Sequence, residues 1–289
     1  MELSTFSYTH ADLSLMPRRE QDSNKGSFGR VLCICGSVGM AGAAYLCAKA
    51  AFRTGAGLVE VLTPEENRTV IQTLLPEAIV SVYSTDSLDI SVINQAIARA
   101  DAVVCGCGLG ISRVSLSVLQ HVLSVCHAPT VLDADALNLI SRNPSLVKFM
   151  KGKIITPHPA EMSRLTAIST EDIANSRNCV CYEFAKKHSL VCALKGHRTA
   201  VSDGDRIYVN TSGNSGMATA GSGDVLAGII GGILAQNKDA KLSLLEAASL
   251  GVYIHGLCGD VAAAQLSEYS VIASDIIASL PKVLKSIPQ

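Results

Sequence analysis

Asn214-Ser-Gly-Met-Ala-Thr-Ala-Gly-Ser-Gly-Asp224, followed by Val225-Leu-Ala-Gly228, is the stretch of the sequence that says most about the fold. Its glycines predict a loop whose backbone N–H groups converge without Cβ obstruction, and the apolar run after it predicts a helix. The unpaired N–H groups and positive dipole end of that helix complete an anion site of phosphate size. Asp224 is then either a helix N-cap or a carboxylate that accepts a proton beside bound phosphate. We favour the carboxylate, because a capped helix needs no glycine-rich loop before it.

Strands alternate with helices on both sides of this loop. Continuous or alternating apolar runs predict strands at 31–35, 58–62, 77–82, 102–107, 130–132, 154–156 and 190–194. Helices are expected at 41–54, 90–99, 114–125, 171–188, 225–234, 244–264 and 272–285, and one more begins at Thr63-Pro64-Glu65-Glu66 with Thr63 as its cap. Asp203-Gly204-Asp205 predicts a hairpin between 199–202 and 206–209.

This order predicts an α/β fold with a mostly parallel central sheet, helices on both faces and a small antiparallel edge hairpin. We expect a single domain over residues 1–289, with residues 1–25 as an N-terminal extension. Ligands of such sheets bind beyond the carboxyl ends of the strands. Nearly every unusual segment of this sequence falls at such an end.

Composition narrows the class of protein. The formal net charge is −1 and Lys and Arg form no dense run, so we expect no nucleic-acid partner. The longest apolar candidate for a membrane span, 225–235, is about half the length needed, so we expect no membrane partner. Residues 1–19 lack a basic start followed by an apolar run, which favours a cytoplasmic protein without a secretion signal. Its ten cysteines are then expected to be reduced thiols.

Four of these cysteines form two Cys-x-Cys pairs, Cys33 with Cys35 and Cys105 with Cys107. On a strand this spacing points both thiols of a pair to one face. A metal site is one interpretation. We favour two buried small hydrophobes in each pair.

Two glycine-rich segments follow predicted strands. Gly36-Ser-Val-Gly-Met-Ala-Gly42 resembles a nucleotide-binding turn without matching Gly-x-Gly-x-x-Gly or a P-loop. Cys105-Gly-Cys-Gly-Leu-Gly110 would let a ligand approach the backbone. In both segments a tight turn without a ligand is an equal alternative.

Charged and imidazole side chains follow three more strands. His158 lies between two prolines, which stiffens its backbone and favours contact with a ligand. Glu161 is either a first-turn acid or a residue that helps to hold hydrated Mg²⁺. Lys195 can meet phosphate as a point charge, or it is a solvated hairpin end. Asp133 and Asp135 could face a metal, although Asp135 could also cap a helix.

In this order, these segments resemble one family, the ADP/ATP-dependent NAD(P)H-hydrate dehydratases of the ribokinase-like superfamily, over about residues 25–285. The matching stretches are 25–30, 36–43, 132–138, 156–161, 195–199 and 214–228. Gly-x-Gly-Asp alone occurs across ribokinase-like kinases, whereas the full ordered set is specific. One departure is Gly106-Cys107-Gly108, where the family usually has Gly-Pro-Gly, and it implies a loop of altered stiffness.

The resemblance implies roles for particular residues. Asp224 would be the catalytic base and would contact the hydrate substrate, NADHX or NADPHX, together with Ala41, Gly108 and His158. The residues that would bind the adenine nucleotide are Lys195, Gly196, His197, Arg198, Thr199, Gly221, Ser222 and Gly223. Apart from the resemblance, Glu161 remains a candidate metal ligand from its position alone, with Mg²⁺ as the ion.

The implied activity is repair of NADHX and NADPHX. Asp224 would take the proton of the ring hydroxyl, whose oxygen attacks the terminal phosphoryl group of ADP or ATP. Elimination of the phosphate then restores the dihydronicotinamide, and ADP ends as AMP. ADP is the donor expected of the bacterial members that the segment 39–42 resembles. By the same resemblance we expect a homo-oligomer, a tetramer, and an epimerase partner as a separate chain, because residues 1–25 are too few for that domain.

Two other functions remain open from the sequence. A small-molecule kinase of the same superfamily, acting on a vitamin-precursor alcohol, would use the same loop and aspartate but yield a stable phosphomonoester. A non-catalytic nucleotide sensor would keep the loop without needing an acid at its end. Asp224 and the stiffened His158 together count against the sensor.

Overall fold

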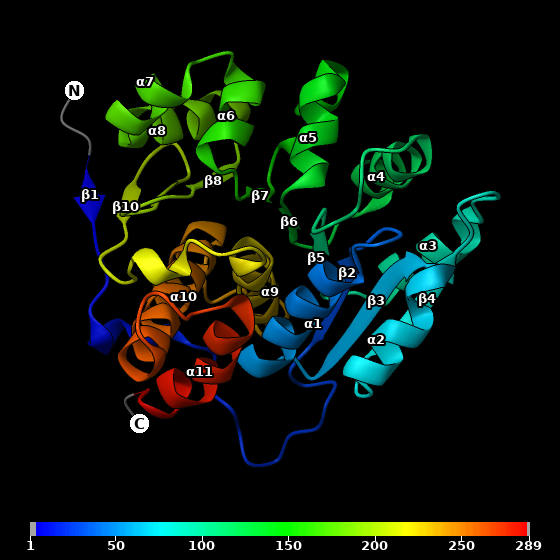
Figure 1. Ribbon diagram of the computed structural model, residues 1–289, viewed down its shortest axis with the longest axis horizontal. Coiled ribbons are helices and arrows are strands. Elements are labelled where there is room, and N and C mark those ends of the chain that lie inside the picture. The colour runs from blue at the N-terminus through cyan, green and yellow to red at the C-terminus, as the bar shows by residue number, and fades with distance from the viewer. Residues whose placement is uncertain (1–3, 288–289) are drawn as a thin grey trace.

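The computed structural model describes residues 4–287, which fold around one ten-stranded sheet (Figure 1). The strand order is β1-β10-β9-β8-β7-β6-β5-β2-β3-β4, and every neighbouring pair is parallel except those that β9 makes with β8 and β10. The strands are β1 (Thr5–Phe6), β2 (Arg30–Ile34), β3 (Leu58–Pro64), β4 (Ile79–Tyr83), β5 (Ala102–Cys105), β6 (Thr130–Leu132), β7 (Ile154–Ile155), β8 (Val191–Leu194), β9 (Ala200–Ser202) and β10 (Ile207–Val209). The predicted mostly parallel sheet is confirmed, and β9 and β10 form the predicted hairpin.

The hairpin is not the outermost element of its side of the sheet. β1, which the sequence did not reveal, pairs in parallel with β10 and forms the edge. Part of the predicted N-terminal extension therefore belongs to the sheet. A two-residue strand carries too short an apolar pattern to be recognised.

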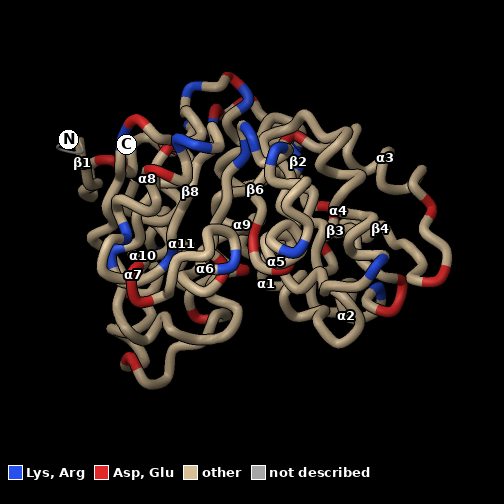
Figure 2. The backbone as a smooth tube through the Cα atoms, turned by 90° about the horizontal axis from the view of Figure 1, so that it is seen from above, with Lys and Arg blue, Asp and Glu red and all other residues tan. Residues whose placement is uncertain are grey.

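Helices cover both faces of the sheet, as predicted (Figure 1). One face packs against α1 (Ala41–Thr54), α2 (Arg68–Leu74), α9 (Ser222–Gln236), α10 (Leu244–Leu266) and α11 (Ala273–Lys285). The other packs against α3 (Ile90–Ala98), α4 (Arg113–Val125), α5 (Asp135–Arg142), α6 (Pro159–Thr166), α7 (Thr170–Asn175) and α8 (Arg177–His188). Short 3-10 helices lie at η1 (His10–Leu15), η2 (Glu65–Asn67), η3 (Pro144–Met150) and η4 (Ser215–Met217). Figure 2 shows acidic and basic residues interspersed along this fold.

The strands are buried on both faces, so their side chains divide between two hydrophobic clusters. In β2, Val31 and Cys33 belong to one cluster and Leu32 and Ile34 to the other. Cys35 continues the first series, so the predicted common face of Cys33 and Cys35 is confirmed. The same prediction is wrong for the second pair. β5 ends at Cys105, so the alternation stops there and Cys107 joins the opposite cluster.

Two predicted helices have different boundaries. β3 continues to Pro64, and the buried Thr63 hydroxyl accepts a hydrogen bond from Asn67 Nδ2 at 2.8 Å. Thr63 is therefore not a helix cap, and α2 follows a 3-10 turn. The helix predicted at 171–188 is two helices, because the backbone of Ser176 leaves helical geometry between α7 and α8.

α10 is long and apolar enough, by length and composition alone, to cross a membrane. In the fold 67% of its most apolar window is buried inside the protein, against α9 and α11. That burial is the pattern of a core helix.

Candidate functional site

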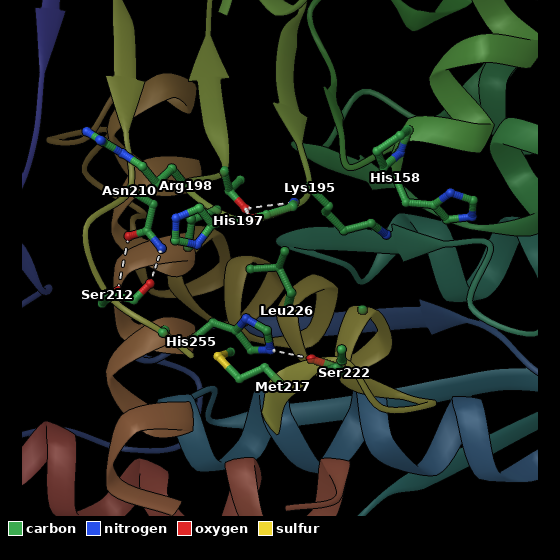
Figure 3. Close-up of a pocket in the computed structure, with 18 of the residues that line it drawn as sticks. His158, Lys195, His197, Arg198, Asn210, Ser212, Met217, Ser222, Leu226 and His255 are labelled. Atoms are coloured by element: carbon green, nitrogen blue, oxygen red, sulfur yellow. Dashed lines mark hydrogen bonds between the residues drawn. The ribbon is translucent and has the colours of Figure 1, made fainter. Parts of the chain in front are cut away.

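The carboxyl ends of β6, β7 and β8 face the N-terminus of α9 across a cavity of about 870 Å³ (Figure 3). This volume lies in the range of small-molecule and cofactor sites. Figure 3 shows Lys195, His197 and Arg198 on the strand side, opposite Ser222 and His255 on the helices. The cavity thus lies beyond the carboxyl ends of the parallel strands, where ligands of such sheets bind.

The glycine-rich loop forms one wall of this cavity. The Asp260 carboxylate fixes its start, accepting hydrogen bonds from Gly213 N at 2.8 Å and Asn214 Nδ2 at 2.9 Å. The loop ends at Gly221, whose φ of 86° is left-handed and so favours glycine. Gly221 is the N-cap of α9 and has no side chain with which to cap it. In the first turn of α9 the N–H of Ser222 donates to the carbonyl oxygen of Thr219 at 3.3 Å, which leaves those of Gly223 and Asp224 for an anion.

Asp224 is the third residue of α9, not its N-cap. The alternative of a simple helix cap is therefore wrong. Its carboxylate lies within 4.8 Å of the Cys107 thiol and the Asp133 carboxylate. Burial and then the charge of Asp133 raise the pKa of Asp224 to about 7, although Cys107 and Lys195 act against the rise. A carboxylate with this pKa can take up a proton near neutral pH.

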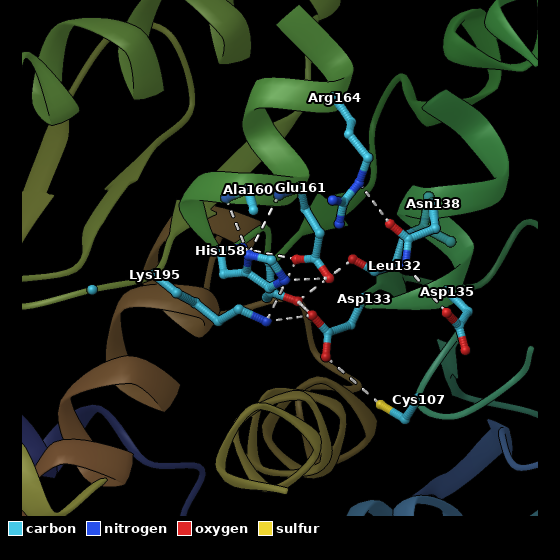
Figure 4. A network of polar contacts seen from close by, with 12 residues as sticks. Cys107, Leu132, Asp133, Asp135, Asn138, His158, Ala160, Glu161, Arg164 and Lys195 are labelled. Carbon is cyan, nitrogen blue, oxygen red and sulfur yellow. Dashed lines mark hydrogen bonds and ion pairs between the residues drawn. The ribbon is translucent and has the colours of Figure 1, made fainter. Parts of the chain in front are cut away.

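Lys195 and Asp133 form an ion pair beside Asp224 (Figure 4). Lys195 Nζ lies 2.7 Å from Asp133 Oδ1, which also accepts a hydrogen bond from Thr156 Oγ1 at 2.7 Å. Burial disfavours the ammonium, but the charges of Asp133 and Glu161 outweigh it and raise the pKa of Lys195. A Cβ on Gly223 would lie only 3.2 Å from Lys195 Nζ, so glycine there lets the ammonium approach α9 closely. The cation therefore lies next to the free N–H groups of the helix.

His158 and Glu161 hold each other at the start of α6 (Figure 4). His158 Nδ1 accepts hydrogen bonds from the backbone N–H groups of Ala160 and Glu161, at 3.1 and 3.4 Å. Glu161 Oε2 accepts the N–H of His158 at 2.8 Å, and Oε1 lies 3.2 Å from His158 Nε2. His158 is thus rigid, as predicted, through this capping box and Pro159. Both side chains also line the cavity.

The turn after β8 forms the opposite wall. Thr199 Oγ1 closes it, donating to the carbonyl oxygen of Gly196 at 3.0 Å and accepting its N–H at 3.3 Å. Arg177 from α8 donates to the carbonyl oxygen of His197. All the residues predicted to bind the nucleotide line the one cavity, namely Lys195, Gly196, His197, Arg198, Thr199, Gly221, Ser222 and Gly223.

Ala41 and Gly108 do not line this cavity. They lie together beyond Cys107, because a Cβ on Gly108 would come within 2.7 Å of Ala43 Cβ in the first turn of α1. Cys107, next to Gly108, contacts Asp133 Oδ2 at 3.8 Å. The Cys107 thiol also lies within 4.8 Å of the Asp224 carboxylate, so the loop that carries Gly108 comes close to this aspartate.

The sequence did not point to several residues that line the cavity. They are Asn210, Ser212 and His255. His255 Nε2 lies 3.3 Å from Ser222 Oγ, and burial lowers the pKa of its imidazole to about 4. Its one sequence signal is a lone histidine within a long apolar helix. Asp135, weighed as a metal ligand with Asp133, accepts the N–H of Gly110 at 2.8 Å and supports that loop.

Comparison with known proteins extends these observations. The NAD(P)H-hydrate dehydratase family pattern matches residues 31–282. A Coxiella burnetii protein named as a bifunctional NAD(P)H-hydrate repair enzyme is 41% identical, over 92% of this chain and 52% of its own. A Neisseria meningitidis protein named ADP-dependent (S)-NAD(P)H-hydrate dehydratase is 38% identical, over 90% of this chain and 84% of its own. The chain spans about half the length of the bifunctional relatives it matches.

Solved structures agree with the fold. A ribokinase-like superfamily protein from Enterococcus faecalis superimposes with a TM-score of 0.86 at 31% identity, covering 97% of this chain and 95% of its own. An ADP/ATP-dependent NAD(P)H-hydrate dehydratase from Bacillus subtilis, co-crystallised with ATP and Mg²⁺, gives a TM-score of 0.81 at 27% identity, covering 99% of both chains. The predicted ribokinase-like fold is confirmed.

Proposed function

This chain belongs to the NAD(P)H-hydrate dehydratase family, and from that membership we propose that it is an ADP-dependent (S)-NAD(P)H-hydrate dehydratase. One observation supports the proposal above the others. Asp224, with a pKa raised to about 7, lies in the first turn of α9 beside a cavity lined by residues suited to a polyphosphate. This arrangement combines a general base with an anion site.

We propose that the cavity holds the adenine nucleotide. Its phosphates would meet the free N–H groups at the start of α9 and the Lys195 ammonium, which together offset the charge of a phosphoryl group in transfer. The turn that starts at Gly196 and closes at Thr199 would contact the rest of the nucleotide. The hydrated dihydropyridine would lie on the other side of Asp224, near Ala41 and Gly108, within reach of His158.

The proposed reaction has two stages. Asp224 accepts the proton of the ring hydroxyl while that oxygen forms a bond to the terminal phosphorus of ADP, and the bond to AMP breaks. The ring nitrogen lone pair then expels the phosphate with the C–O bonding electrons, and the adjacent ring carbon loses a proton. The products are NAD(P)H, AMP and phosphate. Phosphorylation matters because phosphate is a far better leaving group than hydroxide.

Oxygen donors suited to Mg²⁺ border the same cavity. Asp133 is 1% exposed and Glu161 4% exposed, and both lie near Lys195 Nζ, at 2.7 and 4.0 Å. The Lys195 ammonium lies close to both carboxylates, so they are poorly placed to surround a metal ion by themselves. They fit better a hydrated ion that arrives bound to the nucleotide. When bound, Mg²⁺ would neutralise phosphate charge, with Asp133 and Glu161 contacting its waters.

The test is to incubate the protein with chemically hydrated NADH and ADP, then with ATP, and to measure recovery of dihydronicotinamide absorbance, phosphate and AMP. We expect these three products in equal amounts with ADP. A stable phosphorylated product would instead indicate a small-molecule kinase. Nucleotide binding without consumption of either substrate would indicate a sensor.

Several wider assignments belong to the same proposal. We propose that residues 1–289 form one domain, that the enzyme is a cytoplasmic homo-oligomer, and that NADHX and NADPHX are both substrates. Sedimentation of the purified protein tests the oligomeric state, with a single monomeric species as the contradicting result.

A further inference from the structure

Three buried thiols from three different elements converge behind Asp224. Cys35 follows β2, Cys47 lies in α1 and Cys107 follows β5, and their sulfur atoms all lie within 4.8 Å of one another. Each residue is 0% exposed. The proposed dehydratase reaction assigns none of these thiols a role.

The cluster has a polar connection to the cavity. Cys107 Sγ lies 3.8 Å from Asp133 Oδ2 (Figure 4), and the carboxylates of Asp133 and Asp224 lie within 4.8 Å of it and of each other. Both carboxylates line the cavity. Purely hydrophobic packing of cysteines would not place one thiol against two acids.

We propose that Cys35, Cys47 and Cys107 form a binding site for one Cu⁺ ion. Thiolate sulfur is the ligand type that soft ions such as Cu⁺ select. Within residues 4–287 these three sulfurs lie mutually within 4.8 Å, which suits the three sulfur ligands that Cu⁺ accepts. Cys33 Sγ lies 3.8 Å from Cys47 Sγ and outside this group. Each thiol that binds the ion releases a proton to solvent, and no electron is transferred.

The geometry requires little movement. Metal–sulfur bonds of about 2.3 Å, in a planar three-coordinate site, hold the sulfurs about 4 Å apart. The present separations, within 4.8 Å, reach that arrangement by shifts of less than about 1 Å.

The experiment uses the full chain with Cys179→Ser, which removes the exposed cysteine of residues 4–287. The reduced protein is titrated without oxygen with Cu⁺ against a colorimetric Cu⁺ chelator. We expect one ion per chain, held by three sulfur scatterers in X-ray absorption. Cys107→Ser and Cys47→Ala, each added to this background, should weaken binding by about a hundredfold or more. The matched control is Cys192→Ala, which removes another buried thiol outside the cluster.

Three results would overturn the proposal. The first is failure of the Cys179→Ser protein to retain Cu⁺ against the chelator. The second is full retention by Cys107→Ser and Cys47→Ala, with melting curves that show both variants folded. The third is an absorption spectrum with nitrogen or oxygen ligands in place of three sulfurs. Because binding is measured without substrate, the result is independent of the dehydratase activity.

Discussion

The protonation state of Asp224 is the residue-scale feature on which the proposed chemistry depends. Burial and the Asp133 charge raise its pKa to about 7, while Lys195 opposes the rise. A general base must be deprotonated in the free enzyme before it acts. Asp224, Asp133 and Lys195 would therefore set the pH range of the proposed reaction.

The first prediction is the pH profile of the wild type and of Asp133→Asn. The rate should be low below pH 7, rise through about pH 7 as Asp224 loses its proton, and then level off. Removing the negative charge at residue 133 lowers the pKa of Asp224, so the acid limb of kcat/KM should move to lower pH. An acid limb that stays in place in Asp133→Asn would show that Asp133 does not influence the base.

In Lys195→Met the acid limb of kcat/KM should move to higher pH. The ammonium favours the charged form of Asp224, so its loss raises the pKa of that carboxyl. It should also raise KM for ADP, because a cation beside the phosphates is gone. The measurement is kcat/KM against pH, with Lys187→Met on the exposed face of α8 as a matched control. Equal shifts of the acid limb in Lys195→Met and Lys187→Met would show that any lost positive charge has this effect, and would contradict a specific role for Lys195.

The sequence predicted some site residues better than others, for identifiable reasons. Asp224 and Lys195 were visible because glycine-rich or strand-end patterns mark them. Their proximity to Asp133 depends on the side-by-side order of β6, β7 and β8, which no local pattern contains. His255 was missed because a histidine in an apolar helix has no spacing signal.

At the scale of elements, the position of the site depends on how α9 packs against α1. A Cβ on Gly228 would collide with the Cys47 carbonyl oxygen, and one on Gly232 would lie 2.9 Å from the Ala51 carbonyl oxygen. These glycines let the two helices approach closely. Because α9 carries Asp224 and the N–H groups proposed to bind phosphate, this close packing fixes the proposed active groups relative to the sheet.

We predict that Gly228→Ala destabilises the fold by about 1–3 kcal/mol, since the added methyl group overpacks a backbone contact. Gly42→Ala is the matched control, because nothing lies within 4 Å of its added Cβ. In α1 that change should be neutral or stabilise by up to about 1 kcal/mol. Urea unfolding measures both, and equal stabilities would refute the close-packing account.

Element boundaries were less predictable than the elements themselves. The break between α7 and α8 was missed because residues 171–188 carry a helical pattern throughout. Thr63 resembled a cap because Pro and two acids follow it, but β3 pairs with β4 as far as Pro64. Tertiary pairing overrode the local capping signal in that case.

For the whole molecule, the buried carboxyl of Asp224, the proposed base, has a cost in stability. An aspartate side chain ordinarily has a pKa of 3.8, whereas that of Asp224 in the folded protein is about 7, so the folded state binds the proton more tightly. Stability therefore falls as the pH rises from about 4 to 7, and the destabilisation is fully present above pH 7. Removing the charge should restore that stability.

Asp224→Asn should thus be more stable than the wild type by about 2 kcal/mol at pH 8 and by about 1 kcal/mol at pH 5, and nearly equal to it only below about pH 4. The ~2 kcal/mol is about half of the free energy that the full pKa shift of Asp224 would give, because the carboxyl borders an open cavity where solvent screens its charge. Thermal unfolding at the two pH values measures the difference. Equal melting temperatures at pH 8 would mean that the buried charge costs nothing.

The overall fold was predictable because its determinants are repeated along the chain. Seven apolar strands alternating with helices predict a parallel sheet, and the turn at residues 203–205 predicts the antiparallel pair. The order of strands was not predictable, since adjacent strands such as β5 and β2 are far apart in sequence. The cavity follows from that order, so its full lining appears only in the structure.

The most direct test of the proposed chemistry is to compare turnover and nucleotide binding in Asp224→Asn. We predict that dehydration of hydrated NADH falls by about 10²- to 10⁴-fold, the contribution of a general base. The dissociation constant for ADP should stay close to that of the wild type, because the free N–H groups at the start of α9 and Lys195 remain. Near wild-type turnover in Asp224→Asn would contradict the assignment of Asp224 as the base.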